Sequence, residues 1–248
     1  MFQRMLASAL FAGAAAGLIA ALLHFAFVQP LILLAEQYET GALTHYTSGS
    51  AATDAAPAAE AGHTHAAGTA EAGHTHAPAA ETSDLQRNGL TVLFMGLVYI
   101  AYGMLLTAGF GLAEGAGLRI GPTQGMLWGL AGFAAFQLAP AMGLAPELPG
   151  TIAAELGARQ VWWWSTVAAT ATGIGLLAYG RQVWMYVAAG VLLAAPHVIG
   201  APQPDAFFGL APPELAAAFA ARVLGAALVV WACLGWFAGH FWSRPANA

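Results

Sequence analysis

Long apolar stretches separated by charged residues make up most of the chain. Each stretch contains the roughly 20 residues that an α-helix needs to cross a bilayer. The pattern therefore predicts an all-α integral membrane protein with about six transmembrane helices. The six intervals run from Met5 to Ala35, Asn88 to Ala113, Ile120 to Pro146, Gln160 to Gly180, Gln182 to Pro204, and Val223 to Ser243.

The same pattern divides the chain into three parts. Residues 1–35 are expected to form transmembrane helix 1, and residues 36–87 a soluble, largely disordered, acidic, His-rich loop. This loop lacks the apolar bulk that would offset the entropic cost of ordering it. Residues 88–248 are expected to form a bundle of five further transmembrane helices, with proline-rich outer loops where proline interrupts the helices.

Short features within the apolar intervals predict how the helices pack. Only Gly180 and Arg181 separate the fourth and fifth intervals, which predicts a tight antiparallel hairpin. Pairs of glycines at helical spacing allow two helix backbones to approach closely. Tryptophans at the ends of intervals are expected to anchor the chain at the membrane interface. The glycine pairs are Gly13/Gly17, Gly125/Gly129 and Gly235/Gly239, and the tryptophans are Trp162, Trp163, Trp164 and Trp242.

Composition supports a membrane protein and excludes several other classes. The chain is 59% hydrophobic and only 8% charged, against roughly 25% charged residues in a soluble domain. Its net charge of -5 and its lack of basic patches argue against nucleic-acid binding. The chain contains no lysine, so it cannot supply the lysine of a nucleotide-binding P-loop. An ATP-driven step would have to come from a partner.

The arginines suggest an orientation in the membrane. Six spans place both termini on one side, and an N-terminus inside leaves four arginines on the inner segments and three on the outer ones. This distribution agrees with the positive-inside rule. We therefore expect a multi-pass protein of the inner (cytoplasmic) membrane whose His-rich loop faces the periplasm.

The loop contains the same metal-binding sequence twice. AEAGHTH occurs at Ala59–His65 and again at Ala70–His76, and so presents His63, His65, His74 and His76. Two imidazoles at i and i+2 point to the same side of an extended chain. Neutral imidazole binds divalent transition metals, although it prefers copper or zinc to cobalt. The loop is predicted to capture ions without selecting them; the alternative is a low-complexity solubilising linker.

A second group of candidate ligands borders the membrane. His24 and His197 both fall ~24–30 Å along their helices from the inner boundary, counted at 1.5 Å per residue. Glu36 and Glu39 lie just beyond the first interval. These four residues predict an outer vestibule beneath the loop. The alternatives are histidines that make interhelical hydrogen bonds and glutamates that are solvated at a helix end.

Several segments spread along nearly the whole chain resemble the CbtA-type predicted cobalt transporter subunits. The similar segments are PLILLAEQYE (Pro30–Glu39), LAPAMGLAPELPG (Leu138–Gly150), ARQVWWWSTVAATATG (Ala158–Gly173), PHVIGAPQP (Pro196–Pro204) and PPEL (Pro212–Leu215).

The resemblance implies cobalt as the substrate and a small histidine-bearing membrane partner of the CbtB type. Descriptions of the family favour about five spans, so five helices are possible here. The family offers no catalytic residues, and we expect no enzyme activity. Nor do we expect a permanently bound cofactor, only a captured or transported divalent metal, cobalt and possibly nickel or zinc. The matching segments contain candidate ligands at Glu36, Glu39, Glu147, His197 and Glu214.

Two other functional classes remain open from the sequence. The first is a membrane-bound metal sensor or chaperone that hands ions to another transporter. The second is a haem-binding membrane oxidoreductase with His24 and His197 as axial ligands, because histidine is a common haem ligand.

Overall fold

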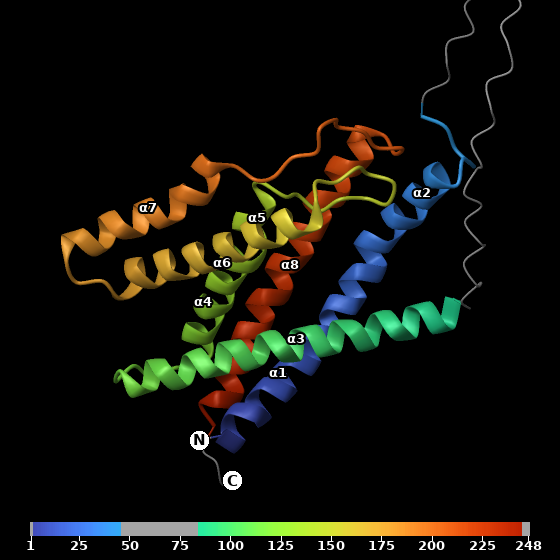
Figure 1. Ribbon diagram of the computed structural model, residues 1–248. Helices are drawn as coiled ribbons and strands as arrows, with labels where there is room; N and C mark the ends of the chain where they lie inside the picture. Colours follow the sequence, from blue (N-terminus) through green and yellow to red (C-terminus); the bar gives the residue numbers. More distant parts are fainter. Residues whose placement is uncertain (1, 46–83, 245–248) are drawn as a thin grey trace, which may run out of the picture.

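The protein is built from α-helices, as the hydrophobic pattern predicted. The computed structural model describes residues 2–45 and 84–244, and these contain no strand beyond one isolated bridge between Thr151 and Gly209. Six continuous helical stretches fall in the six predicted apolar intervals (Figure 1). Three of them, Phe2–Glu39, Asp84–Gly115 and Pro213–Trp242, are long and apolar enough to cross a membrane, and Val183–Ile199 is a shorter apolar helix.

Two of the six stretches are interrupted by a π turn. The first comprises α1 (Phe2–Leu23), η1 (His24–Val28) and α2 (Gln29–Glu39), and the third comprises α4 (Pro122–Phe133), η2 (Ala134–Leu138) and α5 (Ala139–Ala141). The uninterrupted helices are α3 (Asp84–Gly115), α6 (Leu156–Tyr179), α7 (Val183–Ile199) and α8 (Pro213–Trp242).

The long helices α1, α3, α4 and α8 pack through glycine. α1 lies along α3 and α8, and α4 lies along α8. A Cβ atom on Gly17 would lie 2.7 Å from the Cα of Gly96, and one on Gly125 would lie 2.8 Å from the Cα of Gly239. Such distances leave no room for a side chain, so the predicted small-residue pairs do bring helix backbones together.

Aromatic side chains fill the centre of this bundle. Trp231 of α8 and Phe110 of α3 are almost completely buried, and the ring of Trp231 stacks on that of Phe136 at 5.8 Å. Within a membrane this packing stabilises the bundle through van der Waals contact, since lipid tails remove the hydrophobic driving force between helices.

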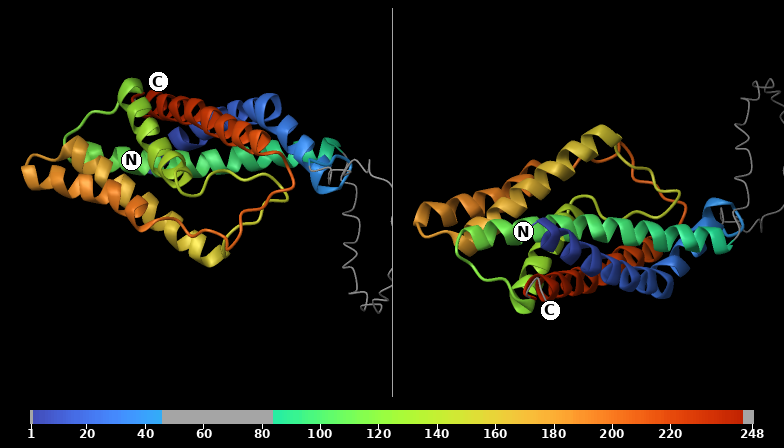
Figure 2. Two further views of the ribbon diagram at one scale, coloured as in Figure 1. Left: turned by 90° about the horizontal axis from the view of Figure 1, so that it is seen from above. Right: turned by 90° about the horizontal axis from the view of Figure 1, so that it is seen from below.

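The α6–α7 hairpin stands apart from the four-helix bundle. α7 packs against α6 and against no other described helix, and α6 meets the bundle near α4, η2 and α5. Figure 2 shows the hairpin as a separate arm that the non-helical segments join to the rest. The turn between the two helices is as short as predicted, because α6 ends at Tyr179 and α7 begins at Val183.

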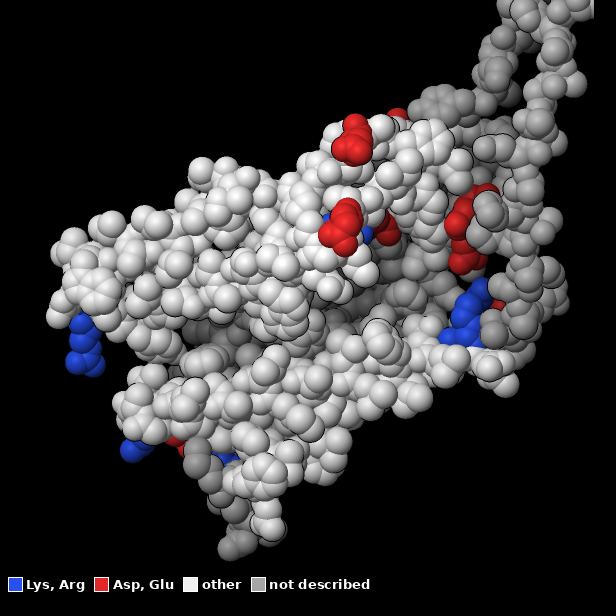
Figure 3. Space-filling model, viewed as in Figure 1, with Lys and Arg blue, Asp and Glu red and all other residues white. Residues whose placement is uncertain are grey.

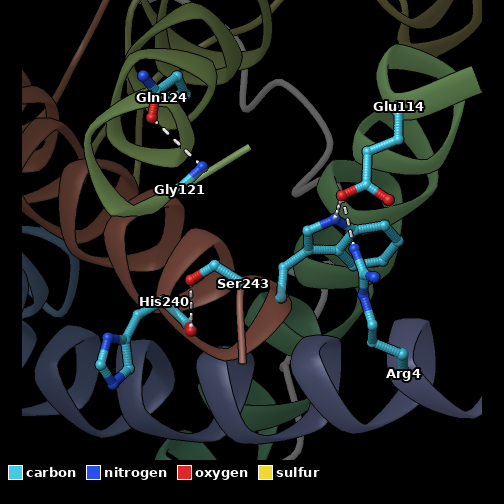
Figure 4. A network of polar contacts seen from close by, with 7 residues as sticks. Arg4, Glu114, Gly121, Gln124, His240 and Ser243 are labelled. Atoms are coloured by element: carbon cyan, nitrogen blue, oxygen red, sulfur yellow. Dashed lines mark hydrogen bonds and ion pairs between the residues drawn. The ribbon is translucent and has the colours of Figure 1, made fainter. Parts of the chain in front are cut away.

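One polar network ties the two ends of the described chain together. Glu114, at the end of α3, accepts hydrogen bonds from Arg4 Nη2 and from Trp242 Nε1, both at 2.7 Å (Figure 4). The Arg4 guanidinium also lies 4.0 Å from the centroid of the Trp242 ring, a cation–π contact. The start of α1 and the end of α8 are therefore held at the same end of the molecule.

Every described acidic residue except Glu114 lies toward the opposite end. These residues end α2, begin α3 or α8, or stand in the connections before α6 and α8, and Figure 3 shows acidic side chains gathered at the upper right of the view. They are Glu36, Glu39, Asp84, Glu147, Glu155, Asp205 and Glu214.

The structure corrects several details of the sequence-based description. The first helical stretch continues to Glu39 and α3 begins at Asp84, so helix replaces loop at both ends of the proposed 36–87 segment. Trp162 is buried and donates a hydrogen bond from Nε1 to the carbonyl oxygen of Pro196, and Trp242 is buried against Glu114. These two tryptophans stabilise helix contacts in addition to their predicted place near the ends of spans.

Candidate functional site

The first helix is broken at the π turn that begins with His24. Residues His24–Val28 form the turn, and the N–H of Gln29 donates to the carbonyl oxygen of His24. Pro30 follows and has no N–H, so the carbonyl four or five residues earlier, of Ala26 or Phe25, loses its helical donor. π turns of this kind are frequent at functional sites.

Polar side chains from two neighbouring helices surround this break. The Nη1 atom of Arg222 in α8 donates to the carbonyl oxygen of Phe27 at 3.3 Å. Just beyond the turn, Gln29 Nε2 donates to Asn88 Oδ1 of α3 at 3.1 Å. A backbone carbonyl at membrane depth is tolerated only where protein groups, water or an ion satisfy it. The contacts of Arg222 and Gln29 therefore make η1 a local polar site.

A second π turn of the same design interrupts the third stretch. It spans Ala134–Leu138, and Pro140 stands six residues after its start, as Pro30 stands six residues after His24. Pro140 leaves the carbonyl of Phe136 or Ala135 without its helical donor. Both η1 and η2 contact α8, which therefore passes between two broken helices.

An open cleft of about 350 Å³ lies beside η2. Its polar lining consists of Gln137 from the π turn, Glu147 from the following connection, and Arg159 and Gln160 from α6. Arg159 Nη2 lies 2.9 Å from Glu147 Oε2. Both side chains are about one-third exposed, so this ion pair orients the carboxylate more than it stabilises the fold.

The proline-rich connections before α6 and α8 pack against the elements that form the polar sites at η1 and η2. Leu148 is buried between α2 and α8, beside Val28, Leu31 and Phe219. The N–H of Ile152 donates to the carbonyl oxygen of Phe208 at 3.0 Å, which joins the two proline-rich connections. The connections are thus packed parts of the fold.

Glu155 begins the helix that carries Arg159 and Gln160. Its carboxylate accepts hydrogen bonds from the N–H groups of Gly157 and Ala158, both at 2.7 Å. These two backbone donors lower the pKa of Glu155 from its ordinary value. The charged carboxylate is therefore the N-cap of α6.

The described histidines and acids do not gather into one metal centre. Among residues 2–45 and 84–244, no three His, Cys, Asp or Glu side chains stand close enough to hold a metal ion together. His24 lies in η1, and the ring of His197, in the last turn of α7, lies 6.4 Å from that of Trp162. The proposed vestibule is therefore not preformed by ligand side chains of the described residues.

The remaining predicted ligands lie at the ends of elements. Glu36 and Glu39 belong to the last turns of α2, and Glu214 to the first turn of α8. Glu147 alone lines the cleft beside η2. The loop histidines His63, His65, His74 and His76 lie outside the described residues.

Sequence reasoning missed Arg222 and Asn88 as groups around η1, and it also missed a short internal repeat. Gly143–Leu148 reads GLAPEL and Gly209–Leu215 reads GLAPPEL, so Glu147 and Glu214 occupy matching positions in an internal repeat. Each glutamate is followed by an arginine, Arg159 or Arg222, that contacts one of the two polar sites. The arginines follow their glutamates by 12 and 8 residues, so the repeat marks the glutamates and not the arginines.

The arrangement offers oxygen ligands beside a helix that both sites share. Freed carbonyls, the amide oxygen of Gln137 and the carboxylate of Glu147 suit hard divalent cations, and the imidazole of His24 suits transition metals. Broken helices with exposed carbonyls are a common way for transporters to hold ions.

Comparison with known proteins identifies a family for the chain. No curated protein and no solved structure matched the chain. One family model, described as "Probable cobalt transporter subunit (CbtA)", matches residues 2–243, nearly the whole chain. The chain therefore belongs to the CbtA family of probable cobalt transporter subunits.

Proposed function

We propose that this chain is the membrane-embedded conduit of a divalent transition-metal transporter, with cobalt as its ion. The observation that carries the proposal is the pair of π turns, each followed by proline, on either side of α8. In a member of a cobalt transporter subunit family, these turns supply carbonyl oxygens where an apolar helix would offer none. The ion passes along α8 between η1 and η2.

The His-rich loop collects ions for this path. The loop connects α2 to α3, and the ends of both helices lie at the acidic end of the molecule, near Glu36, Glu39 and Asp84. Imidazoles on an acidic tether raise the local concentration of divalent cations. We place this end in the periplasm and the paired termini in the cytoplasm of an inner-membrane protein.

A partner subunit completes the transporter. The family description names a subunit, and the chain contains no lysine with which to build a P-loop. We propose a small histidine-bearing membrane protein, of the CbtB type, as the partner.

Radioactive cobalt uptake into membrane vesicles tests the conduit. Vesicles with the chain, alone or with the partner, should take up cobalt faster than empty vesicles. Replacing both Pro30 and Pro140 by alanine supplies the missing N–H donors and should lower uptake at least tenfold. Pro122→Ala is the matched control, because Pro122 occupies the first turn of α4, where no helical donor is needed.

The same measurement separates the competing functions. Tight cobalt binding without uptake, in the presence of the partner, would support a sensor or chaperone and overturn the conduit. A Soret band in the purified protein would instead favour the haem oxidoreductase. Unchanged uptake in the Pro30→Ala/Pro140→Ala variant would mean that transport does not use the π turns.

A further inference from the structure

A long apolar groove separates the α6–α7 hairpin from the four-helix bundle. It has a volume of about 660 Å³, and its walls come from α3, α4, α6 and α8. Figure 3 shows the hollow between the arm and the body of the molecule. Most of the lining is aliphatic or aromatic, including Leu105, Leu127, Trp128, Ile174 and Trp231. This groove is distinct from the cleft beside η2, although Phe136 borders both.

One end of the groove carries hydrogen-bond donors and a positive charge. Arg119 and Gln124 line that end, on the connection between α3 and α4 and on the first turn of α4. The Arg119 side chain forms no ion pair with a described carboxylate. The amide oxygen of Gln124 accepts from the N–H of Gly121, which leaves its amino group to donate elsewhere.

No carboxylate opposes this charge within the groove. The nearest acid in sequence, Glu114, accepts hydrogen bonds from Arg4 and Trp242 and is not part of the lining. The groove is therefore apolar along its length and cationic at its mouth. A ligand of matching form has an apolar chain and an anionic head.

The groove runs along α4 and η2. Its lining residues there extend from Gln124 to Phe136, or about 18 Å at 1.5 Å per residue. A single acyl chain is much narrower than a helix, and it suits the aliphatic lining.

The mouth also lies at the end of the molecule that we place at the cytoplasmic membrane surface. Arg119 is at the end of the molecule that carries Arg4, Arg181 and Arg244, where α3 ends and α4 begins. Basic pockets between transmembrane helices are known to bind anionic headgroups. From the charge, shape and position together, we infer that the groove binds an anionic phospholipid, with its headgroup on Arg119 and Gln124 and one acyl chain along α4 and α6.

Lipid binding to the purified full chain tests this inference. Native mass spectrometry should detect phosphatidylglycerol bound in preference to phosphatidylcholine with the same acyl chains. Arg119→Gln should weaken phosphatidylglycerol binding about fivefold, the factor that one basic residue provides at an anionic surface. Arg181→Gln is the matched control, since Arg181 is exposed at the same end but outside the groove.

A second pair of variants tests the acyl-chain position. A Cβ on Gly175, in the groove wall, or on Gly190, in α7, would meet nothing within 4 Å, so a side chain can start at either position without a clash at Cβ. Gly175→Leu should obstruct the groove and abolish specific lipid binding, and Gly190→Leu should leave it unchanged. Melting temperatures of both variants verify that the fold is intact.

Three results would overturn the inference. The first is equal binding of the two lipids, and the second is equal loss in Arg119→Gln and Arg181→Gln. The third is that the partner subunit displaces the lipid and does not bind to the Gly175→Leu variant. The groove would then be a binding site for a protein. None of these outcomes depends on cobalt transport, so the lipid site and the proposed function can fail separately.

Discussion

Arg222 is the residue that most directly links α8 to a broken helix. Its guanidinium donates to the carbonyl oxygen of Phe27, within the π turn. This hydrogen bond places a fixed positive charge beside carbonyls that could otherwise receive a cation. Arg222 therefore stabilises the turn by satisfying this carbonyl oxygen.

Removal of Arg222 should loosen the π turn. In Arg222→Ala we expect amide hydrogen exchange over residues 24–31 to become about fivefold faster, because one hydrogen bond of about 1 kcal/mol is lost. Arg222→Lys keeps the charge and should show a smaller change. Mass spectrometry of exchanging peptides measures the effect. If Arg181→Ala, at the far end of the molecule, accelerated the same peptides equally, the change would not come from the Phe27 contact.

Glu155 gives α6 a dependence on pH. Its pKa is lowered in the folded protein by the hydrogen bonds from Gly157 and Ala158, so the charged form stabilises the fold. That stabilisation is complete above the ordinary glutamate pKa of 4.5 and is lost as pH falls through the lower native value.

Hydrogen exchange as a function of pH should reveal this dependence. The first turn of α6 should lose protection on acidification, after correction for intrinsic exchange rates, and Glu155→Ala should lack this acid-dependent loss. Glu39→Gln, in the last turn of α2, serves as the control. An unaltered profile in Glu155→Ala would exclude the carboxylate as the cap.

At the scale of helices, glycine determines which pairs can form. The Cβ that alanine would add at Gly235 lies 2.8 Å from the Cα of Gly129, a backbone atom that cannot turn aside. At Gly225, on the same helix, an added Cβ meets nothing within 4 Å. The two positions therefore differ in packing while sharing a helical environment.

Alanine at these two glycines should have opposite effects on stability. Gly235→Ala should destabilise the protein by about 1–3 kcal/mol through overpacking between α4 and α8. Gly225→Ala should be neutral or slightly stabilising, because alanine favours helix over glycine. Thermal unfolding in detergent measures both. Similar melting temperatures for the two variants would show that α4 and α8 do not pack as closely as described.

The helices and their close contacts were predictable from local sequence. Six apolar intervals became six helical stretches, and the spaced glycines face one another, because span length and residue size are properties of short segments. The π turns escaped prediction. Pro30 and Pro140 lie in runs that otherwise favour continuous helix, and the change of register depends on tertiary contacts.

The polar sites were much less predictable. Glu147 was identified, but its partner Arg159 was not. Glu114 was not predicted as a structural residue, yet it joins Arg4 to Trp242 across more than 100 residues of sequence. Such pairings arise from the fold, and hydrophobic periodicity contains no information about them.

At the scale of the whole molecule, charge separates the two ends. We expect the N-terminus, the α3–α4 connection and the α6–α7 turn on the cytoplasmic side. Single cysteines at Gln3, Arg181 and Ser50, in a Cys233→Ser background, should report this with a membrane-impermeant thiol reagent. Only the cysteine at position 50, in the His-rich loop, should react from the periplasm. Labelling of position 181 from that side would invert the topology.

The His-rich loop should matter only when metal is scarce. Deleting residues 63–76 should reduce cobalt uptake at low external cobalt and spare it at high cobalt, because the loop concentrates ions without forming the path. Replacing His63, His65, His74 and His76 by asparagine should have the same effect at unchanged loop length. Equal loss at both concentrations would place the histidines within the transport path itself.

The contact between α1 and α8 has a consequence for biosynthesis. Of the described helices, α1 is synthesised first and α8 last, so Trp242 can meet Arg4 and Glu114 only after α8 has been made. α4 also packs against α8. Until α8 is present, the glycine surfaces that it later covers are exposed to lipid. The bundle of α1, α3, α4 and α8 therefore cannot close before α8 is made, and a chain that stops before Pro213 lacks the helix that joins its parts.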